Sequence, residues 1–406
     1  MHPSSPAASP SVSRRRFIGQ TSLGAAAVAT ASVSSLFSTS GCGRAEAPTA
    51  TASTSSASPS SAASPDPSAA SAAPRKLGVA LVGLGGYATH LLAPALQQTR
   101  HCALRGVVTG SREKGLRWAR QFGFPEQSVY GYDTMAQLAG NPDIDVVYVV
   151  TPNALHAEHT IAAARAGKHV ICEKPMAVTV AECDAMLAAC RAAGVQLFIG
   201  YRLQFEPHFD ELKRLAREQD FGPLQRMTGA VAFTMTQPQW RAEKKLAGGG
   251  PLMDLGIYAV QAACMAAGEI APIAVTAKER PKERPEFFRD VEETLDWTME
   301  FASGARAQFV TSYNAGADTF RAEGARGWIE FTPAFAYGGL KTTTHRGPLE
   351  IAAPPSQQAV QLDAMALCLR EGRAAPASGA MGRRDMVILE AIYEAARTGG
   401  RVEVKT

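Results

Sequence analysis

A strand that runs directly into a glycine turn is the feature that most limits what this chain can fold into. Residues 77–83 read LGVALVG, and residues 83–88 form a GxGxxA turn that opens a helix through His90 to Gln98. Glycines here allow a tight turn and let backbone N–H groups approach a pyrophosphate at the helix N-terminus. We therefore expect a dinucleotide to bind there, with an ordinary strand-to-helix turn as the alternative. The expected contacts are Gly83, Leu84, Gly85, Gly86 and Tyr87.

The same alternation of strand and helix continues to residue 200. The β-rich runs LRGVVTG, DIDVVYVVTP, KHVICEKP and VQLFIGYR are separated by Ala-rich amphipathic segments. Strand and helix in this rhythm predict an α/β fold with a doubly wound parallel sheet. We assign residues 76–200 to this nucleotide-binding Rossmann domain and residues 201–406 to a second domain.

The second domain contains an amphipathic strand pair. Val291, Leu295, Trp297, Met299 and Phe301 alternate with polar residues, apart from Glu293. A turn at residues 303–304 then leads into a partner strand over residues 306–313. This pattern predicts an antiparallel sheet with one face that needs cover.

The N-terminal residues differ in kind from the rest. SRRRFIG at residues 13–19 precedes about twenty weakly apolar residues, which resembles a twin-arginine export signal. We expect residues 1–42 to be this signal, with a transmembrane anchor as the alternative. Cys42 lies in a sequence like a lipoprotein site, but Thr39 replaces the usual Leu, so lipidation and cleavage without lipid both stay open.

Residues 43–75 are expected to form a disordered Ala/Ser/Pro tether. Residues 44–74 contain no Val, Ile, Leu, Met, Phe, Trp or Tyr, so they cannot bury enough apolar surface to become ordered. We therefore expect an exported, periplasmic or extracytoplasmic protein that is anchored to a membrane if Cys42 is lipidated.

Charge and cysteine usage narrow the function classes. The chain has 41 basic and 37 acidic residues, a net charge of +4, and no dense run of Lys or Arg, so we expect a small-molecule partner and no nucleic acid. The seven cysteines have no metal-ligand spacing. We expect no metal site and assign the six after Cys42 to the core, with a disulfide as the alternative outside the cytoplasm.

The end of the second predicted strand indicates which nucleotide binds. An NAD enzyme usually has Asp or Glu there, about twenty residues after the glycine turn, to hold the ribose 2′-hydroxyl. This chain has no acid at the tip, and hydroxyls and cations follow, which suits the 2′-phosphate of NADP. The alternative is that the cations only begin a solvated helix. The residues concerned are Thr109, Ser111, Arg112 and Lys114.

Two later strand ends supply further candidates at the same sheet edge. Pro152, Asn153 and His156 follow the fourth strand, although Asn153 also suits a helix N-cap and His156 an ordinary first helical turn. Glu173 and Lys174 follow the fifth strand. Because a residue before proline favours extended backbone, we expect Lys174 to project from the strand tip and not to sit on the surface.

The stretch LAGGGPLMDLGIYAV, residues 246–260, leads from a glycine loop into a helix. Pro251 fits the first helical position and Gly268 a helix end, so Asp254 and Tyr258 fall on one face a turn apart. A structural alternative makes Asp254 a partner of the helix dipole and Tyr258 a half-buried aromatic.

These motifs together resemble the glucose-fructose oxidoreductase family, also called Gfo/Idh/MocA. The similar segments are GLGGYA, PNALHAEHTIAAARAGKHVICEKPMA, FIGYR, QWRAEKKLAGGGPLMDLGIYAV and EAIYEAARTG, within residues 76–406. The resemblance is strongest to glucose-fructose oxidoreductase and its aldose-oxidising relatives, since most of the wider family has His at the position of Tyr258. It implies a Rossmann domain followed by an α/β domain with a large open, mostly antiparallel sheet.

The resemblance also implies roles for individual residues. Tyr258 is the expected acid/base, Asp254 orients the sugar hydroxyl, and Lys174 lowers the pKa of the phenol, which is ~10 when unperturbed. Arg202, Trp240 and Arg241 are expected to border the sugar beside the cofactor, with interdomain packing as the alternative. The second domain is then a substrate-binding and oligomerisation domain, and the partner is another copy in a dimer or tetramer.

The implied reaction oxidises an aldose at C1 to its lactone and reduces a second sugar or carbonyl compound. An exported dehydrogenase has no evident supply of free NADP, so we expect tightly bound NADP and a ping-pong cycle. One alternative is a dehydrogenase of a sugar derivative or polyol with exchangeable NAD(P). Another is a non-catalytic nucleotide- or sugar-binding protein.

Overall fold

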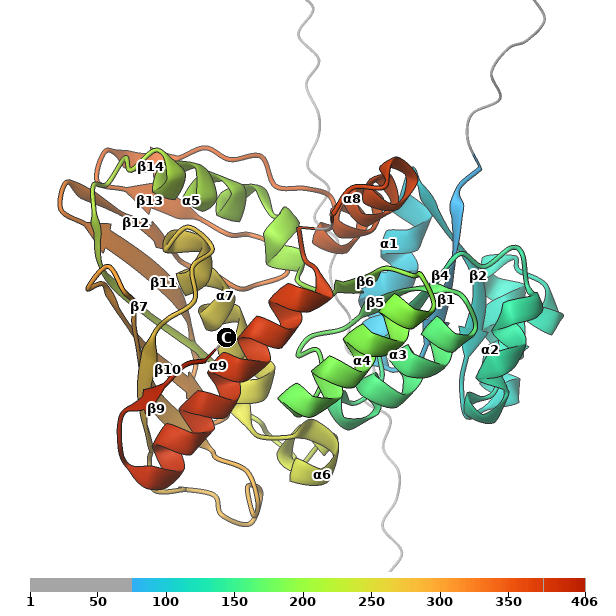
Figure 1. Cartoon of the computed structure of the whole chain (residues 1–406), viewed down its shortest axis with the longest axis horizontal. Helices are drawn as coiled ribbons and strands as arrows, with labels where there is room; N and C mark the ends of the chain where they lie inside the picture. The colour runs from blue at the N-terminus through green and yellow to red at the C-terminus, as the bar shows by residue number, and fades with distance from the viewer. Residues whose placement is uncertain (1–74, 375, 406) are drawn as a thin grey trace, which may run out of the picture. The chain divides into compact units, whose positions relative to one another are not determined.

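The computed structural model describes residues 75–374 and 376–405 (Figure 1). The predicted export signal, the Cys42 lipidation site and the tether up to residue 74 lie outside the described residues. The predictions for these segments therefore stay predictions.

The first sheet has six strands, all parallel, in the order β3-β2-β1-β4-β5-β6. Its central strands are almost wholly buried, as expected for a parallel sheet with helices on both faces. The strand order reverses between β1 and β4, and ligands of such sheets bind at the carboxyl ends beside this point. The predicted doubly wound fold is confirmed. Its strands are β1 (Leu77–Val82), β2 (Cys102–Val108), β3 (Val129–Tyr130), β4 (Val146–Val149), β5 (His169–Cys172) and β6 (Leu197–Ile199).

Local sequence sets the ends of several helices around this sheet. The Ser111 side chain accepts a hydrogen bond from the Lys114 amide at the start of α2, and Gly123 ends α2 in a left-handed conformation. The predicted helix from His90 to Gln98 differs in detail, because its first turn, η1, is a π-helix. The helices are η1 (Ala88–Leu92), α1 (Ala93–Gln98), α2 (Arg112–Phe122), η2 (Glu126–Ser128), η3 (Tyr132–Gly140), η4 (Asn153–Leu155), α3 (His156–Arg165) and α4 (Val180–Ala192).

The second sheet has nine strands in the order β14-β13-β12-β11-β7-β10-β9-β8-β15. Only the β7–β10 pair is parallel, so the sheet is mostly antiparallel, as predicted. Its strands are β7 (Leu224–Ala232), β8 (Ala274–Glu279), β9 (Thr294–Glu300), β10 (Arg306–Ser312), β11 (Ala317–Gly324), β12 (Gly327–Phe331), β13 (Thr342–Thr344), β14 (Gly347–Leu349) and β15 (Val402–Glu403).

The predicted alternation in β9 is confirmed, because its apolar residues are buried and the polar ones between them are half-buried.

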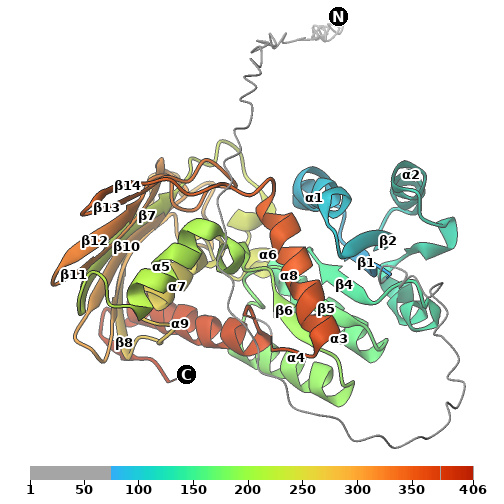
Figure 2. The same cartoon turned by 90° about the horizontal axis from the view of Figure 1, so that it is seen from above.

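Figure 2 shows α5, α7 and α9 along one face of the nine-stranded sheet, while the described residues place no helix on the other face. The remaining helices are η5 (Arg202–Phe205), α5 (Pro207–Arg217), η6 (Trp240–Ala242), α6 (Lys244–Ala247), η7 (Leu252–Gly256), α7 (Ile257–Ala266), α8 (Gln357–Glu371) and α9 (Gly379–Thr398).

The end of the chain returns to the first sheet. The Asp363 carboxylate in α8 accepts hydrogen bonds from the backbone amides of Arg100 and His101, at 2.9 and 2.8 Å. The backbone amide of Ile199 in β6 donates to the Ala377 carbonyl at 2.8 Å. Residues near the C-terminus therefore complete the hydrogen bonding of the first domain.

Residues 102–368 include six cysteines, all buried and free, which confirms their assignment to the core.

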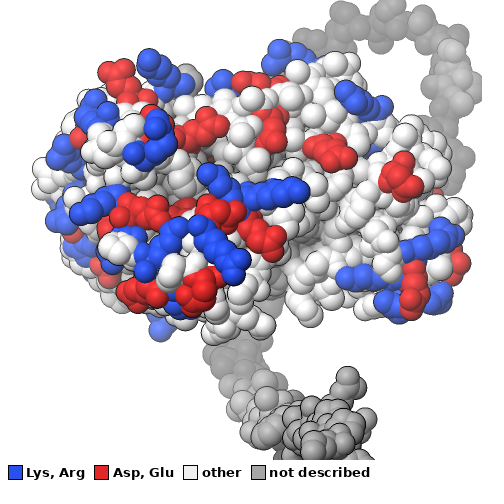
Figure 3. Space-filling model, turned by 90° about the horizontal axis from the view of Figure 1, so that it is seen from below, with Lys and Arg blue, Asp and Glu red and all other residues white. Residues whose placement is uncertain are grey.

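In the described part of the chain, no three His, Cys, Asp or Glu residues form a group that could hold a metal ion. No helix within residues 75–374 and 376–405 is long and apolar enough to cross a membrane. Acidic and basic side chains are intermixed on the face shown in Figure 3.

Candidate active site

A cavity of about 770 Å³ lies at the carboxyl ends of the central parallel strands. Its walls come from the glycine turn after β1, the ends of β2, β4 and β5, and the segment around η6, η7 and α7. It thus brings together residues as far apart in the sequence as Gly83 and Tyr337. The predicted site residues that line it are Gly83, Leu84, Gly85, Gly86, Tyr87, Thr109, Lys114, Pro152, Asn153, His156, Glu173, Lys174, Trp240, Arg241, Asp254 and Tyr258.

The glycine turn combines a strained position with an open one. Gly83 has φ +94°, and a Cβ there would lie 2.9 Å from the Thr151 Cγ2 and 3.0 Å from the Val150 carbonyl oxygen. A Cβ on Gly85, in contrast, would meet no protein atom within 4 Å. Gly83 is therefore required by the fold, whereas the space at Gly85 fits the close approach of a pyrophosphate.

A cation, and no carboxylate, lies at the tip of β2. Thr109 and Lys114 line the cavity, and the Lys114 ammonium donates to the Leu84 carbonyl. Ser111 and Arg112 do not line the cavity, since Ser111 caps α2 and Arg112 is exposed. The two acids that line it, Glu173 and Asp254, belong to other walls of the cavity.

Asn153 and His156 hold backbone segments in place. Asn153 lies inside η4 and not at its N-cap, and its Nδ2 donates to the Ala247 carbonyl at 2.9 Å, which ties the β4 loop to the glycine loop. The His156 ring nitrogens lie 2.8 Å from the Pro175 carbonyl oxygen and 2.9 Å from that of Thr151. Burial lowers the pKa of His156 to about 4, so the ring is neutral and only one of these two contacts is a hydrogen bond.

Lys174, Asp254 and Tyr258 meet in this cavity. The Lys174 ammonium donates to the Asp254 carbonyl oxygen at 2.7 Å and to its Oδ1 at 3.3 Å. The same ammonium lies 4.5 Å from the centroid of the Tyr258 ring. Two of its three N–H groups are thus used by Asp254, and the third is left for a ligand in the cavity.

Asp254 is held by several groups at once. Its Oδ2 lies 3.0 Å from the Arg241 Nε and 3.2 Å from the Tyr313 hydroxyl, which donates to it. Burial raises the pKa of Asp254, but the charges of Lys174 and Arg241 outweigh burial and hold that pKa below its ordinary value. Asp254 is therefore an ionised carboxylate in a fixed orientation.

Charged neighbours set the direction of the pKa shift of the Tyr258 phenol. Burial raises this pKa, but the positive charges of Arg202 and Lys174 outweigh burial and keep it below its ordinary value. The pKa of Lys174 lies above its ordinary value. Burial lowers this pKa, but the negative charges of Tyr258 and Asp254 outweigh burial. The arrangement therefore favours a tyrosine that can exchange a proton beside a permanently charged lysine.

The helix that carries Asp254 and Tyr258 begins with a π-helical turn, η7, and continues as α7. Both side chains still line the same cavity, as the spacing predicts. The buried Glu292 carboxylate holds the preceding glycine loop by accepting from the amides of Gly250 and Leu252, both at 3.0 Å, and from the Tyr393 hydroxyl at 2.9 Å. A π turn often marks a functional site.

Arg202 occupies a different position from the other predicted residues. It is fully buried, does not line the cavity, and contacts the Tyr258 ring with its guanidinium. Trp240 and Arg241 do line the cavity, and the Arg241 guanidinium lies 4.6 Å from the centre of the Trp240 ring.

Sequence reasoning missed several residues of the site. Tyr132, Phe233 and Tyr337 line the cavity. Tyr313 donates a hydrogen bond to Asp254, and Glu292 accepts one from the amide of Gly250. No motif or spacing marks these positions. Tyr132 begins η3, Phe233 follows β7 and Tyr337 lies between β12 and β13, so only the tertiary fold brings these three to the cavity.

A glycine turn with room for a pyrophosphate, beside an ionised carboxylate, a lysine and an acidic tyrosine, defines a nucleotide-dependent enzyme of the Rossmann class. Residues 77–201 match the oxidoreductase family with an NAD-binding Rossmann fold, and residues 209–330 match the GFO/IDH/MocA C-terminal domain. The chain belongs to the Gfo/Idh/MocA oxidoreductase family, as its motifs predict.

Individual relatives cover almost all of the described chain. The structure of aldose-aldose oxidoreductase from Caulobacter crescentus, complexed with glycerol, has 42% sequence identity and a TM-score of 0.79, and the match covers 81% of this chain and 100% of that one. D-xylose 1-dehydrogenase [NADP(+)] from Haloarcula marismortui is 29% identical over 336 residues, 80% of this chain and 92% of the relative. A 1,5-anhydro-D-fructose reductase from Ensifer adhaerens is 29% identical over 308 residues, 74% of this chain and 90% of the relative.

Proposed function

We propose that this chain is an exported NADP-containing sugar oxidoreductase that oxidises an aldose at C1 to its lactone and reduces a second sugar or carbonyl compound. The observation that carries this proposal is the meeting of Lys174, Asp254 and Tyr258 in one cavity with the glycine turn. The similarity to an aldose-aldose oxidoreductase supports the substrate class.

The roles of the three residues follow from their chemistry. When bound, NADP supplies a hydride acceptor for the hydrogen on C1. Tyr258 takes the proton of the C1 hydroxyl, and its lowered pKa makes it a better base than an ordinary phenol. The free N–H of Lys174 donates to the same sugar oxygen, and the fixed Asp254 carboxylate accepts from a neighbouring hydroxyl.

The preference for NADP is supported by the tip of β2. Lys114 lies in the cavity beside Thr109, and no carboxylate stands there to repel a 2′-phosphate. The name of the Haloarcula marismortui relative, D-xylose 1-dehydrogenase [NADP(+)], is consistent with this choice.

Retention of the nucleotide is the part of the proposal that depends on export. An enzyme outside the cytoplasm has no evident source of NADP, so a retained cofactor must be returned to its starting redox state in each cycle. The second candidate function is an NADP-dependent dehydrogenase with exchangeable cofactor, which the D-xylose 1-dehydrogenase relatives favour.

Two measurements test the proposal. First, the exported protein is purified without added nucleotide and denatured, and the released small molecules are identified by mass spectrometry; about one NADP(H) per chain is expected. The same preparation locates the mature N-terminus and any lipid on Cys42.

Second, an aldose deuterated at C1 is incubated with an acceptor sugar and no added nucleotide. Deuterium in the reduced acceptor supports the closed cycle. Turnover only after NADP is added favours the dehydrogenase, and sugar binding with no label transfer favours a non-catalytic binding protein.

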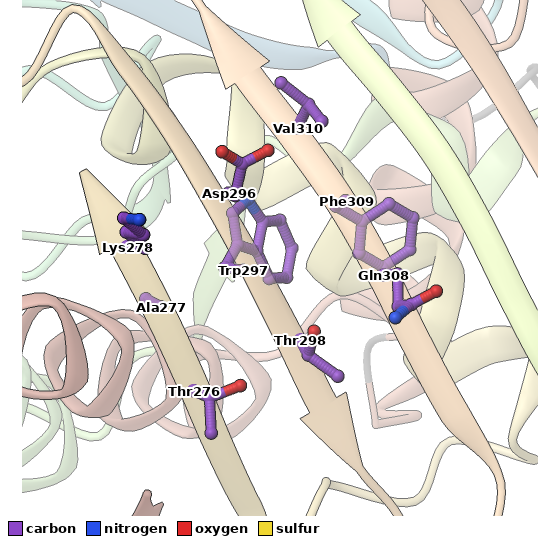
Figure 4. A pocket seen from close by; sticks show the side chains of 9 residues that line it. All are labelled: Thr276, Ala277, Lys278, Asp296, Trp297, Thr298, Gln308, Phe309 and Val310. Carbon is purple, nitrogen blue, oxygen red and sulfur yellow. The ribbon is translucent and has the colours of Figure 1, made fainter. Parts of the chain in front are cut away.

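We also infer that the chain forms a homo-oligomer through the uncovered face of the nine-stranded sheet. This face has a hollow of about 400 Å³ lined by residues of β8, β9 and β10, among them Lys278, Asp296, Gln308 and Val310 (Figure 4). A dimer or tetramer is expected by analytical ultracentrifugation. A Gln308→Arg and Val310→Glu double variant should shift it toward the monomer, and an unchanged mass would place the interface elsewhere.

A further inference from the structure

Arg202 is a fully buried arginine held between two tyrosine rings. Its guanidinium carbon lies 4.7 Å from the centre of the Tyr258 ring and 4.4 Å from that of Tyr337. The edge of the guanidinium donates to the carbonyls of Phe335 and Ala336, the latter at 3.1 Å, and to the Gln357 Oε1 at 2.5 Å. An arginine can do this because its planar group presents two faces and a fork of donors.

The hydrogen-bond partners of this cation are neutral. Among the described residues, no salt bridge includes Arg202, and its acceptors are two backbone carbonyls and an amide. A buried positive charge is costly unless an anion lies nearby. Burial raises the pKa of two nearby carboxyl groups, Glu173 and Glu206, and the charge of Arg202 lowers it, but neither forms a salt bridge with Arg202. The Tyr258 ring is in direct contact with the guanidinium, so an ionised Tyr258 would place a negative charge against it.

We propose that Arg202 is a positioning residue that stabilises the ionised form of Tyr258 and holds Tyr337 as a substrate-side wall of the cavity. This inference rests on the proposed function, in which Tyr258 is the acid/base. It adds to Lys174, the electrostatic partner that the sequence analysis named, a second cation that lies outside the cavity.

Other charged and titratable groups also face Tyr258. Burial raises the pKa of Tyr258, and the negative charge of Glu173 raises it further. The positive charges of Arg202 and Lys174 lower it. The negative charge of Tyr258, followed by burial, raises the pKa of Tyr337, so Tyr258 is the one of the two that ionises. The groups around Tyr258 are Glu173 and Lys174 after β5, Arg202 in η5, Asp254 in η7, Tyr87 in the glycine turn and Tyr337 in the β12–β13 loop.

The Arg202 hydrogen bonds also place Tyr337. Because Arg202 binds the two carbonyls immediately before Tyr337, it fixes that part of the loop between β12 and β13. Tyr337 is 49% exposed, lines the cavity, and lies 6.0 Å from Tyr87 between ring centres. A sugar beside Tyr258 would meet the Tyr337 ring and its protonated hydroxyl.

The test is a spectroscopic titration of Tyr258 that needs no turnover. Tyrosinate absorbance at 295 nm is followed against pH, and each protein is compared with its own Tyr258→Phe counterpart. Arg202→Met is expected to move the Tyr258 midpoint upward by about one to two pH units, because an opposite charge within contact distance is lost. Arg202→Lys keeps a charge and should move it less. An unchanged midpoint in folded Arg202→Met overturns the proposal.

Arg384→Lys is the matched control. Arg384 is also a largely buried arginine that donates to a backbone carbonyl, that of Glu269 at 3.2 Å, but it forms salt bridges with Glu269 and Asp385 and does not line the cavity. Its substitution should leave the Tyr258 midpoint unchanged. An equal shift of the Tyr258 midpoint in Arg384→Lys would mean that the Arg202 effect comes from general destabilisation, and it would overturn the proposal.

Tyr337→Ala keeps the proposal falsifiable if Arg202→Met does not fold. Removing this half-exposed ring takes away the sugar-facing wall that Arg202 holds in place, so KM for the sugar should rise more than kcat falls. An unmoved KM overturns the proposal. If no sugar is ever turned over, the proposed function fails, but the titration still reports whether Arg202 controls Tyr258.

Discussion

Alanine at Gly85 should weaken NADPH binding and leave the fold stable, whereas alanine at Gly83 should destabilise the fold. In Gly85→Ala the new methyl group meets no protein atom within 4 Å, and Gly85 does not have a positive φ. The unliganded protein should therefore unfold at the parent denaturant concentration, or gain up to about 1 kcal/mol from the stiffer unfolded chain. The methyl group instead fills the space that a pyrophosphate needs.

The magnitude of the binding defect follows from overpacking. A methyl group forced into an occupied contact costs about 1–3 kcal/mol, which corresponds to a loss of NADPH affinity of about 5- to 150-fold. Gly83→Ala combines a left-handed backbone with contacts at 2.9 and 3.0 Å, so it should instead destabilise the unliganded fold by about 2–5 kcal/mol.

Urea unfolding of nucleotide-free protein and calorimetric titration with NADPH measure the two effects separately. Gly316→Ala is the control, since its Cβ also meets nothing within 4 Å and Gly316 does not line the cavity. Parent affinity for NADPH in Gly85→Ala would refute the placement of the pyrophosphate at this turn.

Three further predictions concern the catalytic half of the site. Tyr258→Phe should lower kcat by about 10²- to 10⁴-fold while the purified variant keeps its nucleotide, measured by steady-state kinetics and extraction. Because oxidation needs the ionised form of Tyr258, the rate of aldose oxidation should rise with pH through its lowered pKa and the reverse reduction should fall, measured as kcat/KM profiles. Glu292→Gln should lower the free energy of unfolding by about 1–3 kcal/mol in urea titrations, because an amide donor then faces a backbone N–H.

Different results would contradict each prediction. Near-parent turnover in Tyr258→Phe removes that residue from the acid/base role. A kcat/KM profile for aldose oxidation that is flat, or that falls as pH rises, would contradict the requirement for ionised Tyr258. Parent stability in Glu292→Gln would mean that the glycine loop does not depend on the carboxylate.

The parts of the fold that local pattern controls were predictable. Five of the six strands of the first sheet and the β9–β10 pair follow from continuous or alternating apolar runs in the sequence. The two-residue strand β3 and the short strands β13 and β14 carry too little periodicity to be recognised. The π turn at Leu252–Gly256 was also missed, because a spacing of four residues does not distinguish it from an α-helix.

The candidate site was predictable where a motif marks it and not elsewhere. Lys174 precedes a proline at a strand end, and Asp254 and Tyr258 follow a glycine loop, so local sequence places all three near the cavity. Arg202 also follows a strand end, but whether it faces the cavity or packs against Tyr258 depends on the loop around Ala336. Tyr337 reaches the cavity through that same long-range contact, which no local pattern encodes.

The hydrogen bonds between Asp363 and the turn at Arg100, and between Ile199 and Ala377, set an order of events during synthesis. A ribosome delivers the N-terminal leader first and these C-terminal residues last. The nucleotide-binding half thus lacks these hydrogen-bond partners until translation is almost finished, and it becomes complete only after most of the second domain has been made. Under the proposed route of export, in which a twin-arginine signal carries an already folded protein, the chain would form these contacts in the cytoplasm before it departs.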